Sequence, residues 1–138
     1  MENVLLNNGV KMPLLGLGTY LLHNGLECEQ AVLNALNTGY RLIDTAAVYG
    51  NEESVGRAIG KSIVKRQDIF VTTKFLPAEP AYDKAKLSCD TSLKKLGLDY
   101  IDLYLMHLPQ GDINSAWRAM EDLYQEGKVR AIGVSNLR

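Results

Sequence analysis

Histidine, cysteine and tryptophan are scarce in this chain, and long apolar runs are missing. The 138 residues include two histidines, two cysteines and one tryptophan. The histidines and cysteines lie far apart, without the short spacings of a zinc site, so we expect no bound metal. No apolar run approaches the length that spans a bilayer, and the first residues lack the basic and then apolar layout of a signal peptide. These absences favour a soluble, cytoplasmic protein.

Charge of one sign is not in excess either. Fifteen basic and sixteen acidic side chains are interspersed and give a formal net charge of −1. Binding to nucleic acid is not expected, because it needs a basic patch that neutralises phosphates. Cys28 and Cys89 each occupy an apolar position of a helical pattern, where a reduced thiol behaves as a small hydrophobic group. Hydrophobic residues make up 46% of the chain, which is enough for the core of one domain.

What the chain does contain is a repeat of about thirty residues. Residues 4–13 come first and are predicted to form a β-hairpin, because Asn7-Asn8-Gly9 is a turn sequence between two apolar segments. Strand-like apolar runs then recur at spacings of 27 to 32 residues, beginning near Leu14, Arg41, Ile69, Ile101 and Arg130. Residues 14–138 are therefore interpreted as a series of strand and helix units.

Helical patterns fill the gaps between these runs. The first predicted helix has apolar residues at helical spacing from Cys28 to Leu36 and ends near Gly39. The second is expected to begin with Asn51 as its N-cap. The third runs from about Pro80 to Leu96, and the fourth from Asp112 to Gly127. The expected buried faces are Val55, Ile59 and Ile63 in the second helix, and Ile113, Ala116, Trp117, Met120 and Tyr124 in the fourth.

A strand and helix repeat of this length favours a parallel barrel. An eight-unit barrel allots about thirty residues to each unit. A doubly wound sheet would need the Gly-x-Gly-x-x-Gly fingerprint, but here Gly16 and Gly18 are followed by Leu21 at the third position. We predict an α/β fold, a partial (β/α)8 barrel with about four and a half units. Because such a sheet has two open edges, either the chain belongs to a longer protein or its copies self-associate.

Polar residues follow four of the apolar runs: Asp44, Lys74, His107, and Ser135 with Asn136. Parallel strands all point the same way, so groups at their carboxyl ends converge on one rim. Asp44 and Lys74 suit a partly buried ion pair, whose role is either functional or only structural. Ser135 and Asn136 suit binding of an amide, and they equally suit capping a following helix.

Tyr49 and His107 suit proton chemistry at this rim. A lysine ammonium close to Tyr49 would stabilise the phenolate, so the phenol would more readily give its proton to a developing alkoxide. A neutral imidazole at His107 can donate a hydrogen bond to a carbonyl oxygen. The alternatives are a loop tyrosine that only packs on a neighbour and a histidine satisfied within the core. A serine hydrolase is disfavoured because no Gly-x-Ser-x-Gly elbow occurs.

These residues stand within stretches that resemble the amino-terminal half of the aldo-keto reductases, particularly the bacterial 2,5-diketo-gluconate reductase-like and prostaglandin-synthase-like members. The similarity extends over essentially the whole chain. The matching stretches are residues 12–20, 39–46, 49–52, 72–74, 96–107 and 127–136. Two positions depart from the family pattern: Tyr20 replaces a common tryptophan, and Phe75-Leu76-Pro77 replaces the usual Leu-Trp. Both departures bear on substrate fit.

The resemblance implies a role for each of these residues. It implies a catalytic tetrad of Asp44, Tyr49, Lys74 and His107, in which Tyr49 donates a proton while NADPH gives a hydride to a carbonyl carbon. It also implies a substrate-binding group, Tyr20 with Tyr49 and His107, for a small carbonyl compound. The residues that it implies for cofactor binding are Gly18, Thr19, Asp44, Ser135 and Asn136.

Length sets this chain apart from the family that it resembles. Relatives have eight strands, and their second half packs on the nicotinamide and grips the adenosine phosphates. We therefore expect weak binding of NADPH to this chain alone. Two hypotheses follow. In the first, the chain is the catalytic half of an NADPH-dependent carbonyl reductase. In the second, it is a catalytically inactive, truncated barrel that persists as an oligomer.

Overall fold

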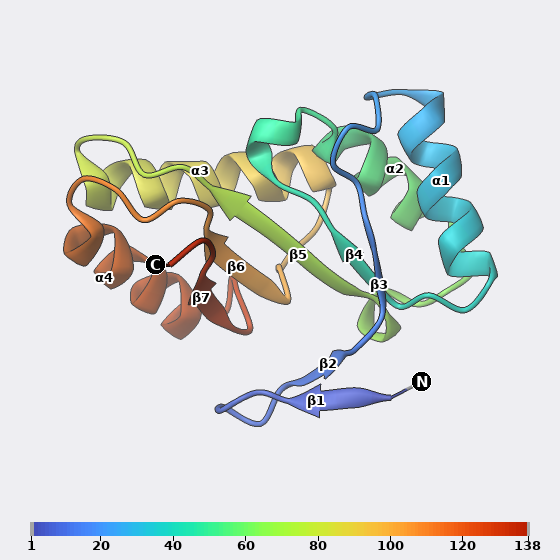
Figure 1. Cartoon of the computed structure of the whole chain (residues 1–138), viewed down its shortest axis with the longest axis horizontal. Helices are drawn as coiled ribbons and strands as arrows, with labels where there is room; N and C mark the ends of the chain where they lie inside the picture. Colours follow the sequence, from blue (N-terminus) through green and yellow to red (C-terminus); the bar gives the residue numbers. More distant parts are fainter. Residues whose placement is uncertain (1, 138) are drawn as a thin grey trace.

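Five short apolar segments pair side by side into one parallel sheet in the computed structural model, which describes residues 2–137 (Figure 1). The strands lie in sequence order, as expected when each returns to its neighbour through a helix. They are β3 (Gly16–Gly18), β4 (Leu42–Asp44), β5 (Phe70–Phe75), β6 (Leu103–Met106) and β7 (Ile132–Val134). The predicted parallel α/β arrangement is therefore present.

Four helices connect these strands and pack in sequence order along the sheet (Figure 1). They are α1 (Leu26–Asn37), α2 (Glu52–Lys61), α3 (Ala81–Leu96) and α4 (Ile113–Gln125), with 3-10 turns η1 (Ala47–Tyr49) and η2 (Arg66–Asp68). Two of the predicted helix ends have the expected chemistry. The Asp112 carboxylate accepts a hydrogen bond from the Ser115 backbone N–H at 3.0 Å, and Gly97 ends α3 with a φ of 64°. None of the helices within residues 2–137 is long and apolar enough to cross a bilayer.

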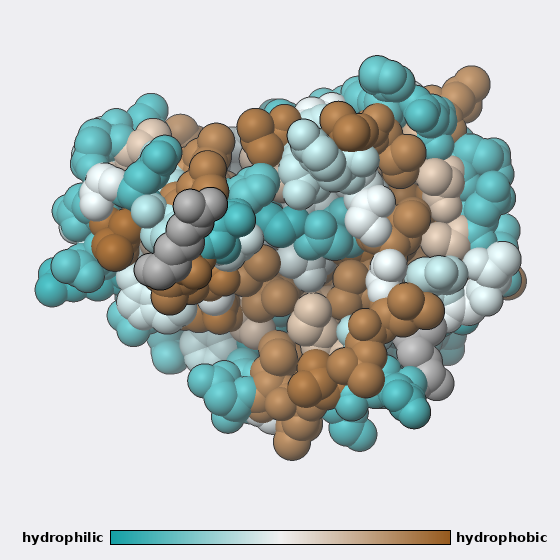
Figure 2. Space-filling model, in the orientation of Figure 1, coloured by the Kyte–Doolittle hydropathy of each residue, from teal (hydrophilic) through white to brown (hydrophobic). Residues whose placement is uncertain are grey.

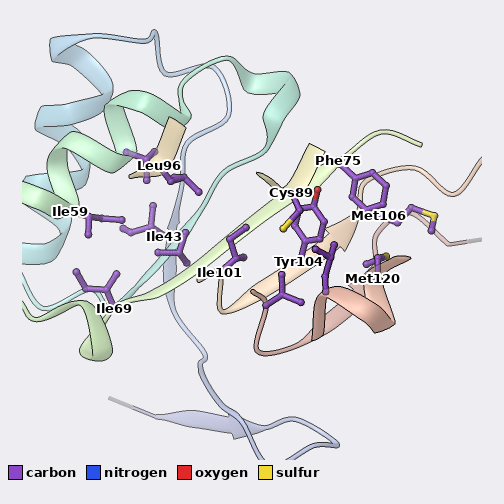
Figure 3. Close-up of a cluster of buried hydrophobic side chains, with 14 of the residues drawn as sticks. Ile43, Ile59, Ile69, Phe75, Cys89, Leu96, Ile101, Tyr104, Met106 and Met120 are labelled. Atoms are coloured by element: carbon purple, nitrogen blue, oxygen red, sulfur yellow. The ribbon is translucent and has the colours of Figure 1, made fainter. Parts of the chain in front are cut away.

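The hydrophobic core lies between the sheet and the helices. Figure 3 shows two neighbouring groups in it, one around Ile43 and Leu96 and the other around Tyr104 and Met120. The ring of Phe75 stacks on that of Tyr104, with centroids 5.0 Å apart. Both cysteines are buried and unpaired, and burial raises the pKa of the Cys89 thiol to about 12. The thiols therefore act as small apolar groups, as the sequence predicted.

Three side chains predicted to be buried lie on the surface instead. Ile63 is 94% exposed because α2 ends at Lys61, so Ile63 lies beyond the helix and not on its apolar face. Ile113 and Tyr124 are 40% and 39% exposed, since they stand at the first and last turns of α4. Ala116 and Met120, at the middle of the same face, are fully buried.

The hairpin covers the end of the sheet at which the parallel strands begin. Strands β1 (Asn3–Leu5) and β2 (Lys11–Pro13) pair antiparallel, and the Asn8 side-chain amide donates to the Arg130 carbonyl oxygen at 2.9 Å. Asp102 is buried here, and its carboxylate binds Arg66 at 2.7 Å and Arg130 at 2.8 Å. A cavity of about 850 Å³ lies between the hairpin and the strand starts. It is remote from the predicted reactive residues, which follow the opposite ends of the strands.

The second face of the sheet has no helices over it in the described chain. In β6, Tyr104 and Met106 face the helices and are buried, whereas Leu103 and Leu105 face the other way and are half-buried. In the view of Figure 1 the strands lie in front of the helices. Figure 2 has the same orientation and shows apolar surface over the hairpin and over part of the sheet. The outermost strands, β3 and β7, each pair with only one neighbour among residues 2–137.

The close contact between α2 and α3 depends on a missing side chain at Gly56. A Cβ atom there would lie 2.2 Å from the Leu96 carbonyl oxygen, whereas a Cβ on Gly60, in the same helix, would meet nothing within 4 Å. We expect Gly56→Ala to lower the free energy of unfolding by about 1–3 kcal/mol through overpacking. Gly60→Ala should instead raise it by about 0.5–1 kcal/mol because alanine favours the helix. Urea denaturation of both variants checks the pair, and equal effects would refute the close-packing argument.

Candidate active site

The register of the parallel strands brings the predicted residues to one rim. Asp44 lies opposite Thr72 in β5, and Lys74, two residues further on, lies opposite Leu105 in β6. His107 follows β6 directly, and its backbone N–H donates to the Phe75 carbonyl oxygen at 2.8 Å. Side chains two residues apart in a strand share a face, so Lys74 points the same way as Thr72 and Asp44.

Lys74 and Asp44 form a bidentate ion pair at this rim. The ammonium nitrogen lies 2.7 Å from Asp44 Oδ1 and 2.8 Å from Oδ2, and it also donates to the Thr45 carbonyl oxygen at 3.0 Å. The Lys74 side chain is nearly buried, whereas about a third of the Asp44 side chain is exposed. An ammonium has three N–H donors, and these three acceptors use all of them. Lys74 therefore acts on other neighbours through its charge alone.

Tyr49 is held beside this ammonium by a short turn. It ends η1, and Gly50 follows in the left-handed conformation with a φ of 68°, which reverses the chain before α2. The Lys74 ammonium lies 5.2 Å from the centroid of the Tyr49 ring, and the ring of His107 stands edge-on to it at 5.8 Å. The ring of Tyr20 also packs against the Tyr49 ring, with centroids 5.1 Å apart. A phenol, an imidazole and an ammonium thus share one small space.

His107 is partly buried, and its environment favours the neutral ring. Burial and, to a lesser extent, the positive charge of Lys74 lower its pKa, against the opposing charge of Asp44. Its Nδ1 atom is enclosed and has no hydrogen-bond partner. Because a buried N–H without a partner is costlier than an unused lone pair, the proton is favoured on Nε2. His107 can then donate a hydrogen bond to an oxygen placed against its open side.

The residues predicted for cofactor binding occupy two flanks of the rim. Gly18 is exposed, and the space where a Cβ would stand is open, so a flat group can approach the backbone. Thr19 is buried, and its hydroxyl lies 3.1 Å from the Asp44 carbonyl oxygen, so it faces the interior. Asn136 has a positive φ of 58° and donates to the His107 carbonyl oxygen at 2.9 Å and to Ser135 Oγ at 3.1 Å. Ser135 and Asn136 therefore adjoin His107.

Asn51 is a residue whose side-chain partners the sequence pattern concealed. It stands at the N-cap position of α2, but its side chain makes no cap hydrogen bond. The amide is instead buried beneath the rim and bonded to Thr19, Leu22 and Thr45. An asparagine before two glutamates is typical of a helix start, so local spacing could not reveal these distant partners. The sequence pattern did not single out Thr45, directly after Asp44, because its bond to Asn51 also depends on the fold.

Comparisons with known proteins settle the family. The model of the aldo/keto reductase family matches residues 14–138. The chain belongs to this family. It is 47% identical to a glyoxal reductase of Bacillus subtilis over 99% of its own length and 50% of that protein. It spans about half the length of the curated relatives it matches.

Solved structures agree with this assignment. An aldo/keto reductase from Brucella melitensis superimposes with a TM-score of 0.94 at 48% identity, covering 99% of this chain and 54% of that one. A Bombyx mori aldo-keto reductase in complex with NADP gives a TM-score of 0.91 at 41% identity, with 99% and 50% coverage. The predicted fold class, a partial α/β barrel, is confirmed.

The neutral state of His107 generates a measurable pH dependence. We expect its NMR titration midpoint to lie below the ordinary histidine value of about 6.5. Between the folded and unfolded pKa values the unfolded chain binds more protons. The contribution of His107 to stability is therefore complete above about pH 6.5 and is lost as the pH falls toward the folded pKa. His107→Gln should remove this part of the pH dependence and leave the resonance of His23. A midpoint at or above the ordinary value would contradict the expectation.

Proposed function

We propose that this chain carries the proton-transfer machinery of an NADPH-dependent reductase that converts aldehyde or ketone carbonyls to alcohols. The gathering of the Tyr49 phenol, the His107 imidazole and the Lys74 ammonium at one rim is the observation that supports it most directly. Membership of the aldo/keto reductase family and a relative in complex with NADP support the cofactor. The two unpaired, buried cysteines are compatible with work in the reducing cytoplasm.

Each residue has a distinct part in the proposed reaction. When bound, NADPH would supply the hydride for the new C–H bond, and the cofactor would thereby be oxidised to NADP⁺. His107 donates a hydrogen bond from Nε2 to the carbonyl oxygen and orients it. Tyr49 gives its proton to that oxygen as negative charge develops there. The Lys74 charge stabilises the phenolate left behind, and Asp44 holds the ammonium in place.

The residues present suit one part of the cofactor. Ser135 and Asn136 would hold the nicotinamide amide beside His107, and the open backbone at Gly18 would border the same space. In a complete barrel, the phosphate site is commonly built by loops after strands 7 and 8. The described sheet has five parallel strands, so these loops have no counterpart in it. We therefore propose weak binding of NADPH to this chain.

Replacing the proposed acid tests this function. At saturating carbonyl compound and high NADPH, we expect slow oxidation of NADPH by the chain, followed by its absorbance. Tyr49→Phe keeps the ring but removes the proton, and it should lower this rate by about 10²- to 10⁴-fold, the usual worth of a general acid. Fluorescence titration should give weak NADPH binding, unchanged in the variant.

A matched control uses another tyrosine. Tyr100 stacks under Arg66 near the strand starts, 4.0 Å from its guanidinium, and Tyr100→Phe keeps that ring. Its rate should equal that of the unaltered chain. Equal rates for Tyr49→Phe and Tyr100→Phe would remove Tyr49 from the reaction. If no turnover by the chain depended on Tyr49, the second hypothesis, a catalytically inactive truncated barrel, would be favoured.

We also propose that copies of the chain associate through the open edge of the sheet at β7. A cavity of about 770 Å³ runs along β7 and α4, and its lining combines apolar side chains, among them Leu103, Trp117 and Ile132, with polar ones from the hairpin turn and α4. Unpaired strand edges beside such a surface favour pairing with another chain.

Light scattering tests this association. We expect the chain to form a dimer that Val134→Lys, a charge added at the half-exposed edge of β7, shifts toward monomer. Leu87→Lys, an exposed position on α3, serves as the control and should leave the dimer intact. A stable, folded monomer of the unaltered chain would refute the proposal.

A further inference from the structure

The Asn51 side chain is a fully used hydrogen-bonding centre beneath the proposed active site. Its amide nitrogen donates to the carbonyl oxygens of Thr19 at 2.9 Å and Leu22 at 3.0 Å. Its oxygen accepts from the Thr45 hydroxyl at 2.7 Å and lies 3.3 Å from the Thr19 hydroxyl. Asn51, Thr19 and Thr45 are all completely buried. An unmatched polar group at this place would therefore carry the full cost of lost hydration.

Only an amide satisfies these four partners at once. A carboxylate of the same shape has acceptors but no N–H donors, so it would face two carbonyl oxygens without a bond to either. An apolar side chain would leave the Leu22 carbonyl oxygen and the Thr45 hydroxyl without these bonds, and the Thr19 carbonyl oxygen with only its bond from the Leu22 backbone N–H. A simple helix cap would not require this combination, because a single acceptor is enough to cap a helix.

The partners of Asn51 come from the segments that hold the proposed reacting groups. Thr45 follows Asp44, and its carbonyl oxygen accepts from the Lys74 ammonium at 3.0 Å. The Thr19 backbone N–H donates to the Asp44 carbonyl oxygen at 2.9 Å, and the next residue, Tyr20, packs on Tyr49. Asn51 itself lies two residues after Tyr49, across the left-handed turn at Gly50.

We propose that Asn51 is a positioning residue that sets Tyr49 relative to the Asp44–Lys74 ion pair by tying together the segments after β3 and β4 and the start of α2. This role rests on the proposed function, since it concerns the geometry of the same proton transfer. Asn51 acts through Thr45 and through its own backbone, and it touches none of the reacting atoms. Its loss displaces the phenol from the ammonium without removing either group.

Two substitutions, one of which removes more hydrogen bonds than the other, test the proposal. Asn51→Asp removes both N–H donors, and Thr45→Val removes only the hydroxyl that binds Asn51 Oδ1. We expect kcat to fall by about 10- to 100-fold for Asn51→Asp, as for a misplacement of about 1 Å, and by less for Thr45→Val, with KM little changed. Thr45→Ser keeps the hydroxyl and should restore kcat.

A second readout uses the chain without cofactor or substrate. NMR contacts between the Tyr49 and His107 rings, assigned with Tyr49→Phe and His107→Gln, should weaken in Asn51→Asp and Thr45→Val and return in Thr45→Ser. This measurement decides the role of Asn51 even if the unaltered chain shows no turnover, a result that would count against the proposed function alone.

Ser54 offers a matched control on the same helix turn. It is buried, and its hydroxyl oxygen accepts from the Gly25 backbone N–H at 2.6 Å and from the Arg57 guanidinium at 2.9 Å. Ser54→Ala should cost comparable stability yet leave kcat and the ring contacts unchanged. If the Asn51 and Thr45 variants change both readouts no more than Ser54→Ala does, Asn51 is only structural and the proposal fails. If Asn51→Asp does not fold, Thr45→Val with its serine rescue decides alone.

Discussion

The register between β4, β5 and β6 is the constraint on which the rest of the rim depends. With Asp44 opposite Thr72, Lys74 reaches the carboxylate from the same face of the sheet. A slip of one residue would turn Lys74 toward the helices, where Thr73 now donates to the buried Glu52 carboxylate at 2.8 Å. It would also bring Thr73 to the rim in place of the lysine. The apolar residues that alternate with these polar ones, Val71 and Phe75, hold the register because they fill the core.

The ion pair at this rim is arranged for its charge rather than for a free donor. Asp44 and the Thr45 carbonyl oxygen use every N–H of Lys74, so the ammonium is fixed and cannot hydrogen-bond to Tyr49 as well. What reaches the phenol is the electrostatic field across 5.2 Å to the ring centroid. Partial burial strengthens that field, because water no longer screens it fully. Holding Lys74 still is therefore the part that Asp44 and Thr45 play together.

Features set by period and direction could be predicted from the sequence, and those set by distant contacts could not. The thirty-residue repeat predicted parallel strands, and their shared direction brought Asp44, Lys74 and His107 to one end. Spacing failed at the helix ends: it extended one apolar face to Ile63 although α2 had already stopped, and it counted Ile113 and Tyr124 as core. It placed Asn51 correctly at the N-cap position of α2, but it did not reveal where the side chain bonds. The partners of that amide lie 6 to 32 residues away, and no local pattern encodes them.

The two ends of the sheet carry different kinds of polar groups. At the strand starts, Asp102 binds Arg66, Arg130 and the Val71 backbone N–H, and this network ties neighbouring strands together. At the strand ends, the polar groups are partly exposed and open to a ligand. The proposed proton chemistry draws on groups from β4 to β6 and their loops, all within the described sheet, whereas phosphate grip in a barrel belongs to strands 7 and 8. Under the proposed function, reactivity and cofactor affinity would therefore be separable, because different segments of a barrel supply them.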